Sequence, residues 1–128
     1  MAAISGFRDL DVYQAAVREA RRIFVLTQRF PREERYSLID QIRRSSRAVG
    51  TMIAEAWGRR RYIAAFINKV DEALSESMET QAWLDHALAS EYVTTEEHRD
   101  HDSAWQRIGG QLNRVMARAQ DFCPRPPP

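Results

Sequence analysis

Apolar and small residues recur at alternating steps of three and four along four segments of the chain. This spacing places them on one side of an α-helix and is typical of helices that pack at shallow angles. The four stripes are, in chain order, Leu10, Tyr13, Val17, Ala20, Phe24 and Thr27; Ile39, Ile42, Ser46, Val49, Ile53 and Ala56; Ile63, Phe66, Val70, Leu74, Ser77, Gln81, Leu84 and Leu88; and Trp105, Ile108, Leu112, Val115, Ala119 and Phe122. The pattern predicts an all-α fold, an antiparallel up-down-up-down four-helix bundle with helices of about 20–28 residues.

Local signals mark the expected helix ends. Pro31 suits the first turn of a helix, where no amide hydrogen is needed, and the acidic pair 33–34 complements the positive end of the helix dipole. Gly58 is a stop signal for the second helix. Thr94 and Glu97 have the spacing of a capping box and predict the start of the fourth helix.

Composition supports one bundle and excludes several other classes of protein. The chain has 128 residues with five Gly and five Pro, and four of the prolines lie in the last five positions. We therefore expect a single four-helix bundle domain over 1–123 and a disordered proline-rich tail over 124–128. The single cysteine excludes a disulfide framework or a thiolate zinc site. With no signal peptide and no long apolar run, the sequence predicts a cytoplasmic protein without a membrane span.

The apolar faces are wider than one helix seam requires. Apolar side chains outside the stripes or at their margins are Ile23, Val25, Leu26, Leu38, Met52, Trp57, Met78, Trp83 and Met116. A globular core that takes an extra position per turn would explain them. The alternative, which we favour slightly, is that some of them pack against another copy of the chain and make the protein a homo-oligomer.

Candidate catalytic and metal-binding residues are few. His98 and His101 lie three apart on a predicted helix and could hold a divalent metal, but such a charged stretch is more often a solvated helix face. Glu76 and Glu79 are read as exposed helix charges, and Cys123 has no histidine near it in the sequence. No phosphate-binding glycine loop is present. The sequence therefore predicts neither an enzyme nor a bound cofactor or metal.

The overall charge of +1 hides an asymmetry. Residues 1–62 carry 13 arginines and 7 acidic residues, a net charge of +6, whereas 63–128 carry 6 basic and 11 acidic residues, a net charge of −5. Basic and acidic helices that neutralise each other would explain this distribution. A basic face that binds nucleic acid or an acidic partner is the sharper alternative.

Arginines gather at two places in the second predicted helix, and they are the candidate binding residues. These are Arg43, Arg44, Arg47, Arg59, Arg60 and Arg61. Asp40 and Glu55 each lie four residues before one of them, so Arg44 and Arg59 have possible internal partners. The remaining positive charge, flanked by Trp57 and Tyr62, suits phosphate and stacking contacts with nucleic acid. Arginines at 59–61 are also explained by the dipole at the end of the helix.

Several short sequence words resemble a known family in their order and spacing. They are Phe7-Arg-Asp-Leu-Asp-Val-Tyr-Gln-Ala15, Phe30-Pro-Arg-Glu-Glu-Arg-Tyr36, Gln41-Ile-Arg-Arg-Ser-Ser46, Ile53-Ala-Glu55 and Gly58-Arg59. The chain resembles, over residue 7 to about 122, the bacterial four-helix bundle proteins encoded within intervening sequences of large-subunit ribosomal RNA genes. The accessory proteins of diversity-generating retroelements look similar. Where the family commonly has Pro, Asn and Gly around the Ile-Ala-Glu word, this chain has Gly50, Met52 and Ala56.

The resemblance implies a four-helix subunit in a ring-like homopentamer. It says less about function, because most of the family has no established activity, while the retroelement branch engages a reverse transcriptase and nucleic acid. The Arg-Arg word of the family maps onto Arg43 and Arg44, and the Gly-Arg word onto Gly58 and Arg59. Our first hypothesis is a non-enzymatic oligomer that binds RNA, DNA or a nucleic-acid-handling protein such as a reverse transcriptase through its arginines. The second is a structural homo-oligomer whose arginines make salt bridges between subunits.

Overall fold

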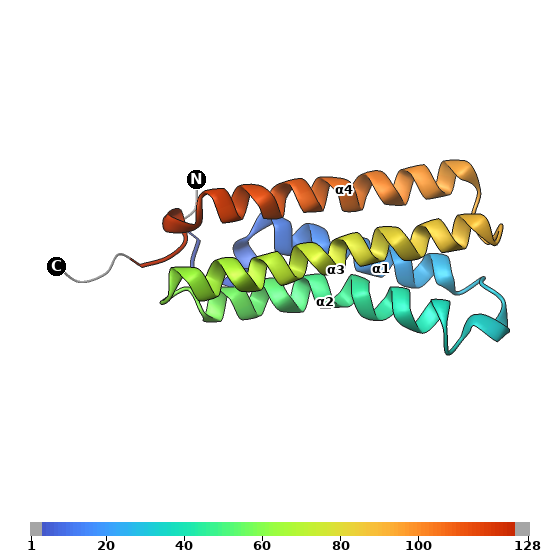
Figure 1. The fold of residues 1–128 in the computed structure, drawn as a ribbon, viewed down its shortest axis with the longest axis horizontal. Helices are drawn as coiled ribbons and strands as arrows, with labels where there is room; N and C mark the ends of the chain where they lie inside the picture. The colour runs from blue at the N-terminus through green and yellow to red at the C-terminus, as the bar shows by residue number, and fades with distance from the viewer. Residues whose placement is uncertain (1–3, 125–128) are drawn as a thin grey trace.

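Four long helices account for most of residues 4–124, which are the residues that the computed structural model describes. Their bounds are Asp11–Thr27 (α1), Leu38–Gly58 (α2), Ile63–Ala89 (α3) and Thr95–Ala117 (α4), with short 3₁₀ turns at Phe7–Asp9, Arg32–Glu34 and Ala119–Asp121. Successive helices run antiparallel, and α1 closes the bundle against α4 (Figure 1). The described residues contain no strand. The predicted all-α four-helix bundle is confirmed.

The predicted stripe on the second segment is confirmed at every position. All six of its residues, from Ile39 to Ala56, are buried. They face a core whose largest fully buried side chains include Phe66 of α3 and Trp105 of α4. Polar groups at the α2–α3 contact are paired, since the Ser45 and Thr80 hydroxyls lie 2.9 Å apart in a hydrogen bond. The bundle core therefore contains side chains of all four helices.

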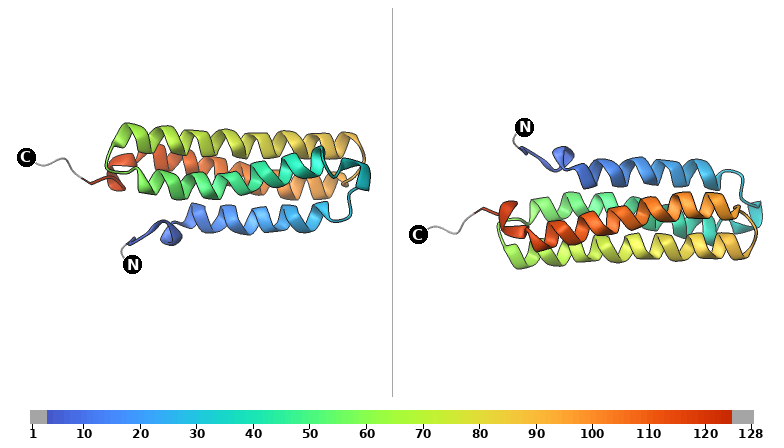
Figure 2. Two further views of the ribbon diagram at one scale, coloured as in Figure 1. Left: turned by 90° about the horizontal axis from the view of Figure 1, so that it is seen from below. Right: turned by 90° about the horizontal axis from the view of Figure 1, so that it is seen from above.

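The predicted stripe on the first segment is partly wrong. Leu10, Ala20 and Thr27 of that stripe are buried, but Val17 is 49% exposed, and the buried face of α1 is centred on Val12, Ala16, Ile23 and Leu26. A charged residue, Glu19, belongs to this buried face, where its carboxylate lies 2.6 Å from the Arg22 guanidinium. Figure 2 shows that α1 lies to one side of the other three helices.

Two predicted helix ends shift in the structure. Pro31 introduces the 3₁₀ turn Arg32–Glu34 rather than α2, which begins only at Leu38. The last helix ends at Ala117, and the final stripe residues follow in or after a second 3₁₀ turn. Gly58 does end α2, as predicted, although no glycine has a positive φ among the residues described. Short turns thus replace the terminal turns of the longer helices that periodicity alone predicts.

The predicted capping box at the start of α4 is confirmed. The Glu97 amide donates to the Thr94 hydroxyl at 3.1 Å, and the Thr94 amide donates to the Glu97 carboxylate at 2.9 Å. The same carboxylate accepts a hydrogen bond from Arg29, at the end of α1. Arg29 and the Thr94 amide together lower the pKa of Glu97 to about 2. The cap therefore fastens α4 to α1 as well as satisfying the first turn.

Replacing Glu97 by glutamine should lower the free energy of unfolding by about 1 kcal/mol at neutral pH. The pKa of Glu97 in the folded protein lies below its usual value of 4.5. The wild-type carboxylate therefore stabilises the fold fully above pH 4.5 and loses this contribution as the pH falls from 4.5 toward 2. The difference between Glu97→Gln and wild type in urea unfolding should therefore shrink over this interval. Glu96→Gln, at the exposed neighbour, is the matched control, and an equal loss in both variants would contradict the prediction.

Most of the surplus apolar side chains pack within the chain. Ile23, Leu26 and Leu38 are buried, while Met52, Trp57, Trp83 and Met116 are partly buried against the core. Only Val25 and Met78 of that set are strongly exposed. Their number alone therefore does not require a second copy. The single-domain bounds at 1–123 and the tail at 124–128 stay predictions, since 125–128 lie outside the described residues.

Candidate functional site

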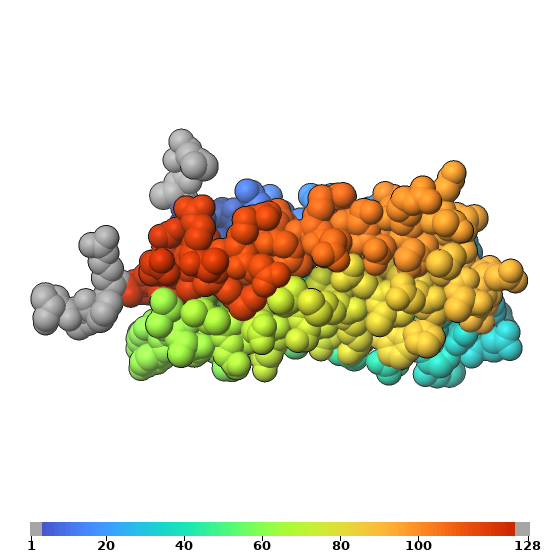
Figure 3. Space-filling model, turned by 45° about the horizontal axis from the view of Figure 1, so that its top comes forward, coloured from blue at the N-terminus to red at the C-terminus, as the bar shows by residue number. Residues whose placement is uncertain are grey.

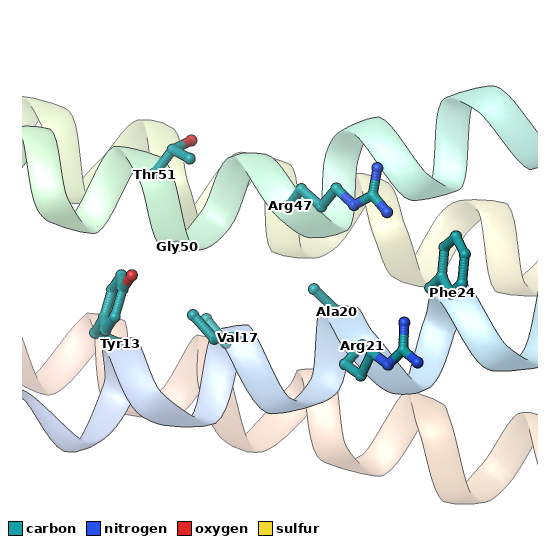
Figure 4. Close-up of a pocket in the computed structure, with 9 residues that line it drawn as sticks. Tyr13, Val17, Ala20, Arg21, Phe24, Arg47, Gly50 and Thr51 are labelled. Carbon is teal, nitrogen blue, oxygen red and sulfur yellow. The ribbon is translucent and has the colours of Figure 1, made fainter. Parts of the chain in front are cut away.

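A groove of about 400 Å³ runs between α1 and α2 and has an apolar floor. Tyr13, Val17, Ala20 and Phe24 line it from α1, and Gly50 lies opposite on α2 (Figure 4). A Cβ on Gly50 would meet Val17 and Tyr13 at ordinary contact distances, so the glycine widens the groove rather than permitting a close helix crossing. The residues of the predicted first stripe that are not in the core therefore form a surface feature.

Three arginines surround the phenyl ring of Phe24 at one end of this groove. The guanidinium carbons of Arg43, Arg21 and Arg47 lie 4.4, 5.0 and 5.5 Å from the ring centroid. Arg21 and Arg47 are exposed and come from opposite sides of the groove (Figure 4). None of the three forms an ion pair with a carboxylate of residues 4–124. We call Arg21, Arg43 and Arg47 the arginine cluster.

Arg43 is the anchored member of the arginine cluster. Its Nε donates to the Thr27 hydroxyl at 2.8 Å, and its Nη2 lies 3.5 Å from the Phe24 carbonyl oxygen. Burial and the neighbouring charge of Arg47 lower the pKa of the Arg43 guanidinium, although an arginine stays protonated at neutral pH. The guanidinium groups of Arg43 and Arg47 thus lie near each other, and neither forms an ion pair with a carboxylate of residues 4–124. This is the electrostatic condition for binding a phosphate or a carboxylate from outside the chain.

Arg44 lies apart from the arginine cluster and has carboxylate partners on α3. Its Nη1 is 3.4 Å from Glu76, and its Nη2 bonds to Glu79. The predicted pairing with Asp40 is therefore wrong, and Glu76 and Glu79 are helix-linking partners rather than free surface charges. The spacing of four residues places Arg44 near Asp40, but the two carboxylates of α3 lie closer to its guanidinium group and pair with it instead.

The arginines at 59–61 lie at the turn between α2 and α3, about 18 Å along the helix axis from Arg47. Arg60 donates to the Trp57 carbonyl at 3.0 Å and stacks on the Trp57 ring at 4.1 Å. Arg59 does not form the predicted bridge to Glu55, because Lys69 lies 2.8 Å from that carboxylate. The six predicted residues therefore occupy separate places rather than one patch.

Ion pairs between the basic and acidic halves of the chain neutralise part of the charge asymmetry. Arg22 bonds to Asp100, Arg29 to Glu97 and Arg44 to both Glu76 and Glu79. Each pair joins the half of the chain that contains α1 and α2 to α3 or α4, and such partly exposed pairs contribute about 0–1 kcal/mol each. The neutralising interpretation is thus correct for these arginines, and the arginine cluster is what it leaves unexplained.

The two histidines proposed as a metal pair point to different places. His98 Nε2 lies 2.7 Å from the Asp85 carboxylate on α3. His101 is buried, and its Nδ1 has no hydrogen-bond partner among residues 4–124. Burial and the nearby Arg22 charge lower the pKa of His101, which favours its neutral form. These two imidazoles therefore do not converge on one site.

Cys123 is poorly suited to nucleophilic chemistry. Burial raises the pKa of its thiol, which reduces the thiolate fraction at neutral pH.

Within the described part of the chain no helix is both long and apolar enough to cross a lipid bilayer.

A match to a protein-family model tests the family resemblance of the short sequence motifs. The model of the 23S rRNA-intervening sequence protein matches residues 8–114. The chain belongs to this family. A solved structure from Bacteroides thetaiotaomicron VPI-5482, described as a protein with unknown function from the S23 ribosomal protein family, is similar at 30% identity with a TM-score of 0.75. The match covers 83% of this chain and 95% of that one. The comparison with curated proteins gives no match.

Membership of the 23S rRNA-intervening sequence protein family agrees with the four-helix fold but does not assign a chemical reaction to the protein. Neither the family description nor the description of the similar structure names an enzymatic activity. The family match includes α1 and α2, and therefore the whole arginine cluster. Sequence reasoning missed Arg21, although it stands next to Arg22, because only the arginine-rich stretches of the second predicted helix were considered; its i, i+3 relation to Phe24 could have indicated it.

Proposed function

We propose that this member of the family is a non-enzymatic homo-oligomer that binds nucleic acid through the arginine cluster. The observation that carries the proposal is the convergence of three guanidinium groups on Phe24 without a carboxylate partner among residues 4–124. Arginines in such a cluster bind phosphate oxygens, and an adjacent aromatic ring offers a stacking surface. Arg59 and Arg61 are exposed and supply further positive charge at the end of the same helix.

Oligomerisation is supported by apolar side chains that one chain leaves exposed outside the groove. Val25 of α1 and Met78 of α3 are 53% and 57% exposed, and neither lines the groove. A second copy that covers Met78 would bury apolar area that one chain leaves in water without covering the groove that holds Arg21. The pentameric ring is what the family resemblance implies, and it is part of the proposal.

The second candidate is a structural homo-oligomer whose arginines pair with acidic residues of a neighbouring subunit. Val17, which is 49% exposed, favours it, because an interface over Val17 and Val25 would place Arg21, four residues from each of them, inside that interface. Exposed carboxylates such as Asp71 of α3 have no ion-pair partner within the described chain and could supply the opposite charge. In this case the arginine cluster would be unavailable to phosphate.

Light scattering and fluorescence anisotropy test the proposal together. We expect a particle of about five times the 14.9 kDa chain mass, and a mass of one chain would contradict both candidates. Labelled RNA and DNA, each single-stranded and double-stranded, should bind at low salt and weaken steeply as salt rises, because phosphate contacts release counterions. An oligomer that binds none of the four nucleic acids at low salt would favour the structural candidate. A nucleic-acid-handling protein such as a reverse transcriptase would then be the partner to test next.

A further inference from the structure

Three potential metal ligands meet on the face between α3 and α4, on the acidic half of the chain. They are Asp85 of α3 and His98 and Asp102 of α4, and one ligand atom from each lies within 4.8 Å of the others. The two helices lie side by side across the face shown in Figure 3. His98 and Asp102 are four residues apart and therefore share one side of α4, the side that faces Asp85. From these contacts we propose that the three side chains bind a divalent transition-metal cation such as Zn²⁺.

The donor set determines the class of cation. One imidazole nitrogen with two carboxylate oxygens is a borderline set that suits Zn²⁺, Co²⁺ or Mn²⁺, whereas Ca²⁺ and Mg²⁺ prefer oxygen ligands alone. Three protein ligands leave room for water in the remaining positions. The proposed metal site shares no residue with the arginine cluster. Metal binding and nucleic-acid binding are therefore tested by separate experiments, and a negative result for one does not contradict the other.

The geometry of the site requires little movement to accept a cation. His98 Nε2 already lies 2.7 Å from Asp85 Oδ1, and a metal would replace this hydrogen bond by two coordinate bonds of about 2.0–2.2 Å. The side chain of Asp85 is 70% exposed, so it is free to turn and the site is open to solvent. Asp102 is held in place because the Gln81 amide donates to its Oδ1 at 3.1 Å. A hydrogen-bonded carboxylate of this kind is a usual support for a metal ligand.

The charges around the site favour a cation. Neither Asp85 nor Asp102 forms an ion pair with a lysine or arginine of residues 4–124. The neighbouring acids on α4 are occupied elsewhere, since Glu97 pairs with Arg29 and Asp100 with Arg22. Two carboxylates that face one imidazole therefore carry negative charge that no lysine or arginine of residues 4–124 neutralises in an ion pair.

Isothermal titration of the full chain with Zn²⁺, followed by Co²⁺ with its visible absorption as the readout, tests the proposal. We expect one ion per chain, a visible band from bound Co²⁺ and a higher melting temperature with Zn²⁺. His98→Ala and Asp102→Asn should each weaken binding at least about tenfold and remove the Co²⁺ band. Asp102→Asn keeps an oxygen that can accept from Gln81, so it is the variant that best preserves the fold.

His86→Ala is the matched control, because His86 is an exposed histidine of α3 that stacks on Trp83 and is not one of the three ligands. It should bind Zn²⁺ like the wild type. Binding that is unchanged by His98→Ala, or lost equally in His86→Ala, would overturn the proposal. So would the absence of Zn²⁺ binding by the folded wild-type protein. Circular dichroism of each variant separates loss of the site from loss of the fold.

Discussion

Replacing Trp105 by alanine should lower the free energy of unfolding by about 3–5 kcal/mol. The Trp105 side chain is fully buried, and its removal leaves a cavity in a core where α3 and α4 meet. The polypeptide around it cannot collapse easily, because the Trp105 carbonyl oxygen accepts a hydrogen bond from the Ser77 hydroxyl at 3.2 Å. Urea unfolding followed by far-ultraviolet circular dichroism, at one chain concentration throughout, measures the loss.

Two comparison variants separate the cavity from other effects. Trp105→Phe removes the indole nitrogen, which has no hydrogen-bond partner in the described part of the chain, and should cost only about 1 kcal/mol. Trp83→Ala should cost about 1–2 kcal/mol, because Trp83 is only partly buried and its Nε1 donates to the Glu79 carboxylate at the surface. Equal losses in Trp105→Phe and Trp105→Ala would show that filling the core is not what Trp105 contributes.

The two helices of the first half show how far periodicity predicts a buried face. In α2 the predicted stripe and the buried face coincide, because this helix packs extensively on both α1 and α3. In α1 the predicted stripe is rotated toward the surface, since Glu19 is buried, pairs with the partly exposed Arg22, and counts as polar in any hydrophobic pattern. A buried carboxylate thus hid the face that the apolar residues of α1 share.

The candidate site was predictable only in part, for a related reason. Runs of arginine in the sequence drew attention to α2 alone, whereas the structure brings Arg21 of α1 to the same ring as Arg47. Arg44, an immediate neighbour of Arg43, points to α3 instead. Adjacent residues on a helix are turned by about 100° from each other, so a sequence run spreads over several faces. Which face is free depends on the packing of the other helices.

Ion pairs between the two halves of the chain explain part of the charge asymmetry. Arg22, Arg29 and Arg44 hold α1 and α2 against α3 and α4, so much of the apparent basic excess is used inside the subunit. The arginine cluster and the carboxylates at Asp85 and Asp102 are among the charges that this pairing leaves over on the two halves. Each is a local concentration of one charge, and a net charge near zero conceals both.

Removing the charges of Arg21 and Arg47 together should weaken nucleic-acid binding by about tenfold or more at low salt. The double variant Arg21→Gln with Arg47→Gln keeps much of each side-chain stem beside Phe24 and loses only the guanidinium groups. Arg43 is left in place, because its side chain is partly buried and its Nε donates to the Thr27 hydroxyl. The slope of log K against log salt should decrease by about 1.4–1.8, since each phosphate contact contributes about 0.7–0.9.

Arg44→Gln is the matched control for this double variant, because it removes an arginine of the same helix whose charge is already paired with Glu76 and Glu79. It should lower stability slightly and leave both the affinity and the salt slope unchanged. A second comparison, Arg59→Gln with Arg61→Gln, removes two exposed charges about 18 Å away. If this pair abolishes the salt dependence while Arg21→Gln with Arg47→Gln does not, nucleic acid binds at the end of the bundle and the arginine cluster has another role. Loss in the first pair alone would locate the phosphate contacts at Phe24, where the three guanidinium groups converge.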